Sequence, residues 1–437
     1  MNARRVQSRR TFLARAAAGV ACATAVRSAP CLRAAAEKPK RILLANCWHA
    51  INIGDIAHGP GMLRLIATHL PEAQVTLWPE PTYANPGPQR PWVDAVTRML
   101  GAAFPRVTIL PPGGVDNGRP VARELIAAID AADLLIVGSG GFHAKAAQAW
   151  TAVTRKPFGG YGNTFSSPSG KTLYEKAAFL FCRDTPSVKL LHDAGIKGPE
   201  IAFGPDSTFG LGLRDEARAE HYLRQAGLVE NKFLCVIPRL RHSPYPEMYG
   251  FAPSDREKEN ARVNAQFKAA DHAAARELIV NWVRATGQKV LACPEMTYGV
   301  PLAREELVDP LPADVRPHVV WRDTFWLCDE AASVFARAVA VVSLDCHSPI
   351  IAIANGTPAI HLRVETDNPT KSRMFADIGL PEWIHENTGM TGARLTQLVM
   401  DIQREPTVAR KKVSAAMEYV WQRQTATMAV VKQALGS

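Results

Sequence analysis

The stretch AVAVVSLDCHSPIIAIANGTPAIHLR, residues 338–363, decides the fold class of this chain. A β-branched apolar run gives way to polar residues at 343–347, an apolar helix-compatible segment follows, and Gly356 separates it from a second apolar run. Residues 52–66, NIGDIAHGPGMLRLI, also follow an apolar run and lead into a helix-compatible segment. A strand, a helix and another strand form the unit of a parallel sheet, and such folds hold ligands at the carboxyl ends of their strands.

The same alternation runs through most of the chain. In the first half we predict strands at 41–47, 74–80, 106–112, 133–139 and 200–206, with helices at about 59–70, 91–103, 120–131 and 184–194. In the second half we predict strands at 232–238, 288–294, 318–323, 338–345 and 358–363. The pattern predicts an α/β protein with two Rossmann-like, doubly wound domains that face a cleft.

The composition divides the chain into four parts. They are a signal segment at 1–36, an N-terminal Rossmann-like domain at 40–215, a C-terminal Rossmann-like domain at 230–390 and a C-terminal helical tail at 391–437, which could cross back onto the first domain. Two stretches interrupt the alternation. Residues 155–172 are rich in Gly, Ser and Pro and predict a loop, and residues 241–271 mix aromatic, proline and charged residues and predict a long irregular insertion.

The first 36 residues have the pattern of an export signal. Residues 8–13 are SRRTFL, a twin-arginine sequence, and an Ala-rich apolar run at 16–26 and an A-x-A site at 34–36 follow. The apolar run is shorter than the roughly 20 residues that span a bilayer. We therefore expect the twin-arginine (Tat) translocase to export the folded protein to a periplasmic or other extracytoplasmic location. A basic amphipathic N-terminal helix is the alternative.

The net charge depends strongly on this segment. The whole chain has a formal charge of +10, but seven arginines and no acidic residue precede Glu37, so removing the segment leaves +3. A nucleic-acid-binding domain needs a clustered basic patch with interleaved aromatic residues, and the sequence has no such cluster. We therefore predict no nucleic-acid partner.

The cysteines predict neither a metal site nor a particular disulfide. Two of the eight lie in the signal segment, and the remaining six are at positions 47, 182, 235, 293, 328 and 346. They form no C-x-x-C pair or Cys/His knuckle, and several lie in apolar strand-like runs, so we expect them to be small buried hydrophobic residues. The sequence predicts no cofactor, and no cluster of metal ligands stands out in it.

Five segments together resemble the polysaccharide pyruvyl transferase family. They are NIGDIAHGPG from 52, GSGGFH at 138–143, the RD and PDSTF segments within 183–209, IPRLR at 237–241 and the region around 343–371. The resemblance runs from about residue 42 to 380, with the segments in the same order. It implies a GT-B-like fold and the transfer of pyruvate from phosphoenolpyruvate to a polysaccharide acceptor as a ketal.

His347 and Asp55 are the candidate catalytic residues. The resemblance matches His347 to the histidine of the family pattern S-x-R-x-H-S, with Ser343 and Ser348 also in place. Pyruvyl transfer needs a general acid that protonates the enol carbon and a base for the sugar hydroxyl. His347 suits the first role. Asp55, which precedes His58 near a helix start, either acts as the base or caps the helix.

The donor's phosphate and carboxylate require positively charged partners, preferably arginine. Arg239 and Arg241 follow a predicted strand and suit this role. Gly140 and Gly141 in GSGGFH fit neither the P-loop nor the GxGxxG pattern, but backbone N–H groups after a strand can form an anion nest. We therefore predict that these four residues bind the anionic donor.

Further polar residues follow predicted strands. Asp206, Glu295, Ser348 and Lys371 are candidate substrate-binding residues, and the resemblance matches Lys371 to a lysine of the family. Glu365 and Asp367 either bind sugar hydroxyls or pair with Lys371. We expect Arg183 and Asp184 to tie a strand to a helix, Tyr161 and Asn163 to reach the acceptor, and Trp48, Trp326 and Trp383 to pack in the interior rather than stack on sugars.

One position departs from the family pattern. Asp345 stands two residues before His347, where the family has arginine, and so reverses the charge expected near the donor. In addition, phosphoenolpyruvate is a cytoplasmic metabolite, whereas the signal segment predicts export. Two alternatives therefore remain: an exported glycan-binding protein that has lost donor recognition, or a transferase that uses another donor.

Overall fold

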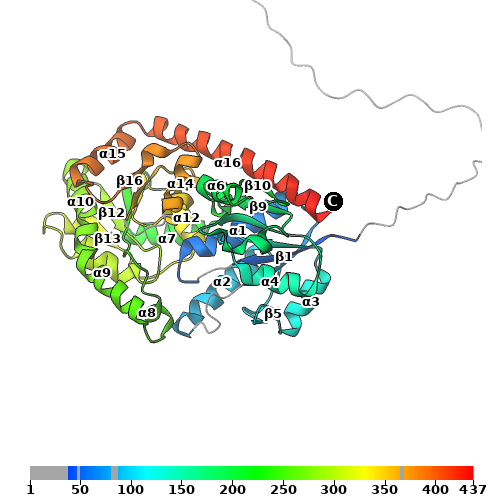
Figure 1. The fold of residues 1–437 in the computed structure, drawn as a ribbon. Helices are drawn as coiled ribbons and strands as arrows, with labels where there is room; N and C mark the ends of the chain where they lie inside the picture. The colour runs from blue at the N-terminus through cyan, green and yellow to red at the C-terminus, as the bar shows by residue number, and fades with distance from the viewer. Residues whose placement is uncertain (1–37, 47–49, 80–86, 365–368, 437) are drawn as a thin grey trace, which may run out of the picture. The chain divides into compact units, whose positions relative to one another are not determined.

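The structure is a computed structural model that describes residues 38–46, 50–79, 87–364 and 369–436. The predicted signal segment at 1–36 lies outside the described residues. The described chain contains two parallel sheets with helices on their faces (Figure 1).

The first sheet has the strand order β10-β9-β8-β6-β1-β2-β3, and its pairings are parallel. Its strands are β1 (Arg41–Asn46), β2 (Gln74–Pro79), β3 (Thr108–Ile109), β6 (Leu134–Val137), β8 (Phe158–Thr164), β9 (Phe179–Cys182) and β10 (Glu200–Phe203), and the short β7 (Gly140–Gly141) pairs with β8. Its helices are α1 (Ile53–His69), α2 (Arg90–Ala103), α3 (Arg123–Ala131), α4 (Ala144–Val153), α5 (Lys171–Tyr174) and α6 (Thr185–Asp193), and β4 (Val115–Asp116) and β5 (Arg119–Pro120) form a separate hairpin. The order reverses between β1 and β6, which is the topological switch point of a Rossmann-like sheet.

The second sheet has the order β13-β12-β11-β14-β15-β16, also parallel. Its strands are β11 (Phe233–Ile237), β12 (Lys289–Ala292), β13 (Val319–Trp321), β14 (Ala340–Ser343), β15 (Ala359–Arg363) and β16 (Ile384–Glu386). Its helices are α7 (Glu216–Ala226), α8 (Tyr245–Tyr249), α9 (Asp255–Asp271), α10 (Ala273–Thr286), α11 (Gly299–Ala303), α12 (Cys328–Phe335), α13 (His347–Ala354) and α14 (Pro369–Asp377). Here the switch point lies between β11 and β14. The predicted α/β class with two doubly wound halves is confirmed.

The central strands are apolar along their whole length. Every residue of β6, β11 and β14 is buried. Helices cover both faces of a parallel sheet, so such strands need apolar residues at every position rather than at alternate ones. Their carboxyl ends are therefore fixed points from which the following loops project.

The C-terminal tail is helical, as predicted, and packs back on the first half. It consists of α15 (Gly392–Arg404) and α16 (Pro406–Leu435). In Figure 1, α16 runs past β9 and β10. Thr427 on α16 shares a hydrogen bond of 2.9 Å with the hydroxyl of Tyr161, and Arg423 donates to the carbonyl of Phe203 at 2.9 Å.

Two predicted boundaries were wrong because tertiary contacts outweigh local composition. Residues 155–172 contain β8, an internal strand whose glycines permit close packing: a Cβ added to Gly159 would lie 2.4 Å from the ring of Phe179. Helix α1 begins at Ile53 rather than near 59, although Gly and Pro residues weaken it. A Cβ at Gly61 would lie 1.9 Å from the carbonyl oxygen of Ser207, so this glycine serves packing.

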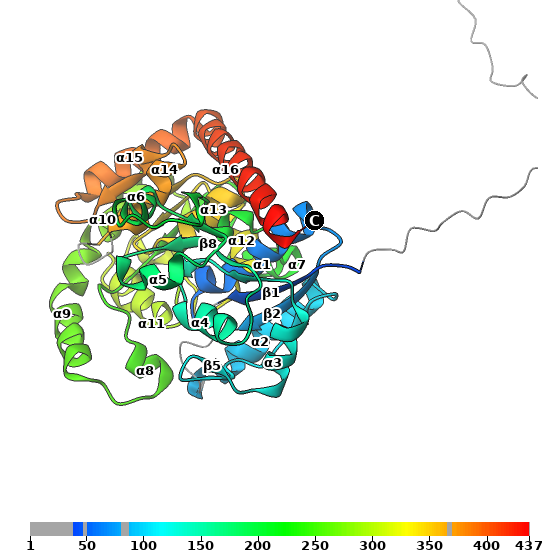
Figure 2. The same ribbon diagram turned by 45° about the vertical axis from the view of Figure 1, so that its right-hand side comes forward.

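The predicted irregular insertion at 241–271 is largely helical. It contains α8 and α9, which lie on the side of the protein away from α16 in Figure 2. A capping box starts α9, because Ser254 and Glu257 each accept a hydrogen bond from the backbone N–H of the other. The alternating charges of this segment therefore belong to a helix surface.

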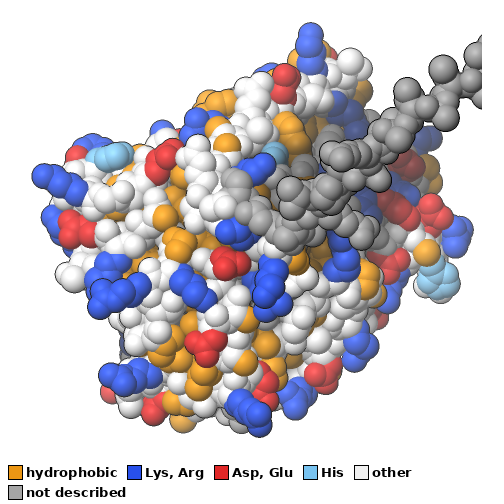
Figure 3. Space-filling view, turned by 90° about the vertical axis from the view of Figure 1, so that its right-hand side faces the viewer, with side chains coloured by type: hydrophobic (Ala, Val, Ile, Leu, Met, Phe, Trp, Pro, Cys, Tyr) orange, Lys and Arg blue, Asp and Glu red, His pale blue; other side chains and the backbone are white. Residues whose placement is uncertain are grey.

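Five of the six predicted core cysteines are described, and all five are free and buried: Cys182, Cys235, Cys293, Cys328 and Cys346. Cys47 lies outside the described residues. None of the described helices is both long and apolar enough to cross a membrane. On the face shown in Figure 3, basic side chains are interspersed with acidic ones.

Candidate functional site

Backbone contacts join the two halves beside the switch points. The N–H of Ile53 donates to the carbonyl of Glu295 at 3.0 Å, and the N–H of Thr297 donates to the carbonyl of Ile51 at 2.9 Å. Between them, Asn52 and Met296 form an antiparallel bridge. The start of α1 is thereby fixed against the segment that follows β12 in the second half.

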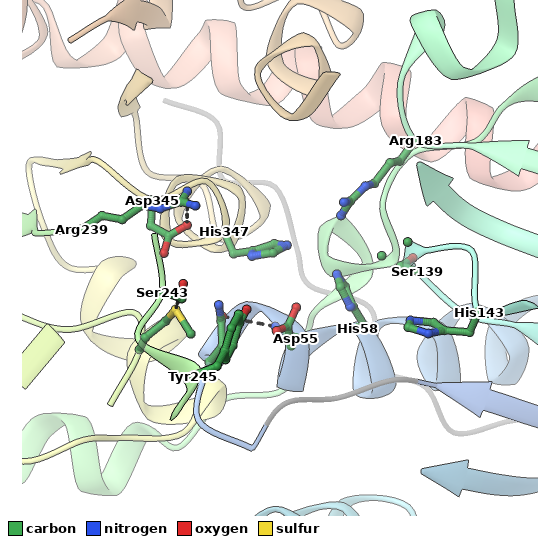
Figure 4. A pocket seen from close by; sticks show the side chains of 14 residues that line it. Asp55, His58, Ser139, His143, Arg183, Arg239, Ser243, Tyr245, Asp345 and His347 are labelled. Carbon is green, nitrogen blue, oxygen red and sulfur yellow. Dashed lines mark hydrogen bonds and ion pairs between the residues drawn. The ribbon is translucent and has the colours of Figure 1, made fainter. Parts of the chain in front are cut away.

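A cavity of about 220 Å³ lies at this junction (Figure 4). Its lining comes largely from the loops after β1, β6, β11 and β14, which are the switch-point strands of both sheets. The lining residues are Asn52, Asp55, His58, Ser139, Gly140, Gly141, His143, Arg183, Arg239, Ser243, Tyr245, Met296, Asp345 and His347. Ligands of doubly wound folds bind at this place in the topology.

Helix α1 brings Asp55 and His58 to the cavity. Asn52 caps the helix, since its side chain accepts hydrogen bonds from the N–H groups of Gly54 (2.7 Å) and Asp55 (3.4 Å). The alternative in which Asp55 is the cap was therefore wrong. Residues three apart lie on one helix face, so Asp55 and His58 both line the cavity.

His58 is 1% exposed, and a buried ion pair supports it from behind. Its Nε2 lies 3.4 Å from Oδ2 of Asp206, and the same oxygen accepts a hydrogen bond of 2.8 Å from Arg183. Burial by itself would raise the pKa of Asp206, but His58 and Arg183 outweigh it and hold this pKa well below its usual range. Asp206 is fully buried behind the cavity, so its predicted contact with substrate was wrong.

His347 begins α13 and is 5% exposed. Its Nδ1 lies 3.3 Å from Oε1 of Glu295, and Glu295 also accepts hydrogen bonds from the backbone N–H groups of His347 (3.3 Å) and Ser348 (2.6 Å). Burial works to lower the pKa of His347, but Cys346 and Glu295 outweigh it and raise this pKa well above its ordinary value. Burial, together with Asp345, raises the pKa of Glu295.

This arrangement corrects two predicted substrate contacts. Glu295 and Ser348 are both fully buried and do not line the cavity. Glu295 instead satisfies the first N–H groups of α13 and orients the imidazole of His347. The glycine at 54 belongs to the same packing, because a Cβ there would lie 2.0 Å from the ring of His347.

The two predicted arginines have different surroundings. Arg239 lines the cavity, and its NH1 lies 3.0 Å from Oδ1 of Asp345. Arg241 is not among the lining residues: it forms two hydrogen bonds to Asp271, at 2.8 and 2.9 Å, and lies over the ring of Phe267. The structure therefore places Arg241 against α9 rather than in the cavity lining, and its contact with the donor stays a prediction. In Figure 4, His347 lies between Arg239 on one side and Arg183 on the other.

Residues 52–366, most of the chain, match the sequence profile of a family described as Polysaccharide pyruvyl transferase. This chain belongs to the polysaccharide pyruvyl transferase family. The resemblance predicted from the sequence is confirmed at the level of the family. None of the curated proteins matches the chain.

Solved structures show the same two-domain fold. UDP-GlcNAc 2-epimerase from Neisseria meningitidis bound to UDP-GlcNAc is 10% identical, with a TM-score of 0.54, and the match covers 90% of this chain and 100% of that one. HepE from Anabaena in complex with UDP and glucose is 13% identical, with a TM-score of 0.53 and coverages of 89% and 98%. The likeness confirms a GT-B-like fold for this family member.

The remaining predicted residues are placed as follows. Gly140 and Gly141 line the cavity, but they form β7 rather than a free loop. The side chain of Lys371 and all of Glu365, Asp367 and Trp48 lie outside the described part of the chain. Buried residues that do not line the cavity are Tyr161, Asn163, Trp326 and Trp383.

Sequence reasoning missed several lining residues, and two of these left a signal. His58 lies three residues after Asp55, a spacing that places both on one helix face. Arg183 directly follows β9, and it was assigned a purely structural role, which was incomplete because it both pairs with Asp206 and lines the cavity. Asp184 caps α6, as predicted. His143 ends the segment GSGGFH, of which only the glycines were predicted to bind a ligand, and no motif marked Tyr245.

Proposed function

We propose that this family member transfers a pyruvyl group from phosphoenolpyruvate to two hydroxyls of a glycan, forms a cyclic ketal and releases phosphate outside the cytoplasm. One observation carries the proposal: His347 and Asp55, which come from different halves, line one cavity together with Arg183 and Arg239. The twin-arginine sequence at 8–13 supports the location.

The side chains supply the proton transfers that the reaction needs. The raised pKa of His347 favours a protonated imidazole, which can give the proton on Nε2 to C3 of the enol. A glycan hydroxyl then attacks C2, and Asp55 takes its proton. The bond from C2 to the phosphate oxygen breaks, the second hydroxyl attacks C2, and its proton leaves with the phosphate.

The two arginines provide positive charge beside this acid and base. Asp206 holds Arg183, and Asp345 holds Arg239, which fixes each guanidinium at the edge of the cavity. Fixed cationic groups bind the phosphate and carboxylate of an enolpyruvyl donor without reorganisation. The donor would therefore lie between the arginines, next to His347.

Asp345 supports a second candidate function. Its carboxylate lines the cavity and offsets the charge of Arg239. A less anionic donor, or a glycan that is bound without turnover, suits this balance better than phosphoenolpyruvate does. The alternatives are thus a transferase with another donor and an exported glycan-binding protein.

The test is phosphate release by residues 37–437 incubated with phosphoenolpyruvate and envelope glycans. We expect His347→Ala to lower the rate by about 10²–10⁴-fold, the usual contribution of a general acid. His221→Ala, which changes an exposed histidine on α7, is the control and should match the wild type. Glycan binding that survives His347→Ala, with neither phosphate release nor donor binding by calorimetry in the wild type, would favour the binding protein instead.

A further inference from the structure

Three metal-binding side chains converge in the cavity from both halves. Asp55, His58 and His347 each offer one ligand atom, and these atoms all lie within 4.8 Å of one another. Metal–nitrogen distances of about 2.0–2.1 Å require donor atoms roughly 3–4 Å apart. Asp55 is only partly buried, so rotation of its side chain can close the remaining gap.

The histidine rings present nitrogen atoms that lack a hydrogen-bond partner among the described residues. These atoms are Nδ1 of His58 and Nε2 of His347, whereas Nε2 of His58 faces the carboxylate of Asp206. The two residues are 1% and 5% exposed, and buried polar atoms are rarely left unsatisfied. The rings approach edge to face, with centroids 5.2 Å apart. A ligand that accepts electron pairs from both rings would satisfy them.

A buried carboxylate lies behind each ring. Asp206 is 3.4 Å from Nε2 of His58, and Glu295 is 3.3 Å from Nδ1 of His347. Histidines that ligate metals commonly donate their second ring N–H to a carboxylate, which orients the ring and makes the ligating nitrogen more basic. The arrangement leaves Nδ1 of His58 and Nε2 of His347 for an ion.

We propose that Asp55, His58 and His347 bind a divalent transition-metal ion of the Zn²⁺ or Mn²⁺ class. Two imidazoles and one carboxylate suit such ions, whereas Mg²⁺ and Ca²⁺ prefer oxygen ligands alone. The three ligands line a cavity of about 220 Å³, which leaves room for a water molecule or a substrate oxygen to complete the coordination. Binding of the ion is independent of the proposed function.

A second group of possible ligands shares His347. Glu295, Cys346 and His347 are all buried, and their ligand atoms also lie within 4.8 Å of one another. In this group Glu295 already accepts hydrogen bonds from the N–H groups of His347 and Ser348, and neither Glu295 nor Cys346 lines the cavity. The group in the cavity is therefore the metal site.

The ion and the proposed acid exclude each other, because Nε2 of His347 cannot hold a proton and a metal at the same time. If the proposed transfer takes place, excess Zn²⁺ suppresses phosphate release and a chelator restores it. Release that increases with Zn²⁺ would keep the metal site and overturn the acid role of His347. Failure of the proposed function leaves the binding measurements below intact.

The direct test is titration of chelator-stripped protein with Zn²⁺ by calorimetry and with Co²⁺ by visible absorption. We expect one ion per chain, with binding weakened by about 100-fold or more in His58→Ala and His347→Ala. We expect a loss of about 10–100-fold in Asp206→Asn, which removes the negative charge behind His58 and Arg183 but leaves the three ligands unchanged. His221→Ala is the matched control, and Cys346→Ser should bind as the wild type does. Circular dichroism of each variant checks its fold.

Three results would overturn the assignment. They are the absence of stoichiometric binding by folded wild-type protein, unchanged binding by folded His58→Ala, and a Co²⁺–thiolate absorption band that disappears in Cys346→Ser. If the alanine variants fail to fold, the thermal shift of the wild type replaces them. An ion that binds only the folded state raises the unfolding temperature further, roughly with the logarithm of its concentration, once that concentration exceeds the dissociation constant. No such rise in the wild type would reject the site.

Discussion

The two histidines of the cavity are placed alike but supported differently. His58 lies near the start of the helix after β1, and His347 begins the helix after β14, each with one ring nitrogen facing a buried carboxylate. Asp206 behind His58 also binds Arg183, and its pKa is well below normal. Glu295 behind His347 has Asp345 nearby, and its pKa is raised. The charge of Asp206 is therefore balanced by an imidazole and a guanidinium, whereas the charge of Glu295 is balanced by an imidazole and a helix N-terminus only.

A third buried histidine shows what happens without a carboxylate against the ring. The Nδ1 of His272 lies 2.6 Å from the carbonyl of Lys268, and its Nε2 accepts a hydrogen bond from the N–H of Arg239 at 3.2 Å. Burial lowers the pKa of His272 to about 4. Burial without a carboxylate against the ring keeps His272 neutral, whereas the carboxylate behind His347 helps to keep that ring charged.

The largest effect is expected from Asp206→Ala. The substitution leaves the guanidinium of Arg183 buried without its carboxylate partner, and breaking a buried pair in this way costs about 3–5 kcal/mol. Unfolding in urea should show the loss as a lower midpoint. Asp314→Ala, which breaks an exposed pair with Arg284, is the control and should change the midpoint little. An equally small change for Asp206→Ala would mean that Arg183 does not depend on this carboxylate.

The sequence predicted where the candidate site lies in the fold better than it predicted which side chains line the cavity. Polar residues after apolar runs located His347, Asp55 and Arg239, because the switch points of doubly wound sheets follow from strand order. Arg241 could not be separated from Arg239, since Asp271, which holds Arg241, lies 30 residues away at the end of α9. The local pattern does not encode such distant partners.

The wrong predictions about the fold and about Glu295 have a similar cause. The strand β8, with the sequence FGGYGNT, was predicted as a loop because glycine lowers strand propensity. Its glycines instead allow close packing, with the ring of Phe179 against Gly159. Glu295 followed a strand and so was predicted to contact substrate, but its carboxylate accepts the first N–H groups of α13, which begins more than 50 residues later.

The second prediction concerns pH and His272. Its pKa is about 4 in the folded protein and about 6.5 in the unfolded chain, so the unfolded state binds the extra proton between these values. Stability should therefore fall as the pH decreases from about 6.5 to 4, by up to roughly 3 kcal/mol from this residue. His272→Gln keeps an acceptor for Arg239 and cannot titrate, so its urea midpoint should fall less over this range. Identical pH profiles for the two proteins would refute the assignment.

The smallest effect is expected from Glu295→Gln, and it tests the comparison most directly. The amide oxygen can still accept the N–H of Ser348, so the change removes the charge but keeps the helix cap. Hydrogen bonds to charged groups exceed neutral ones by about 1 kcal/mol, and the stability loss should be of that size. Phosphate release, measured alongside urea unfolding, should fall by more than the loss of folded protein explains. The reason is that His347 loses the carboxylate that favours its protonated form. A loss of stability as large as that of Asp206→Ala would show that folding depends on the negative charge of Glu295 as strongly as on that of Asp206.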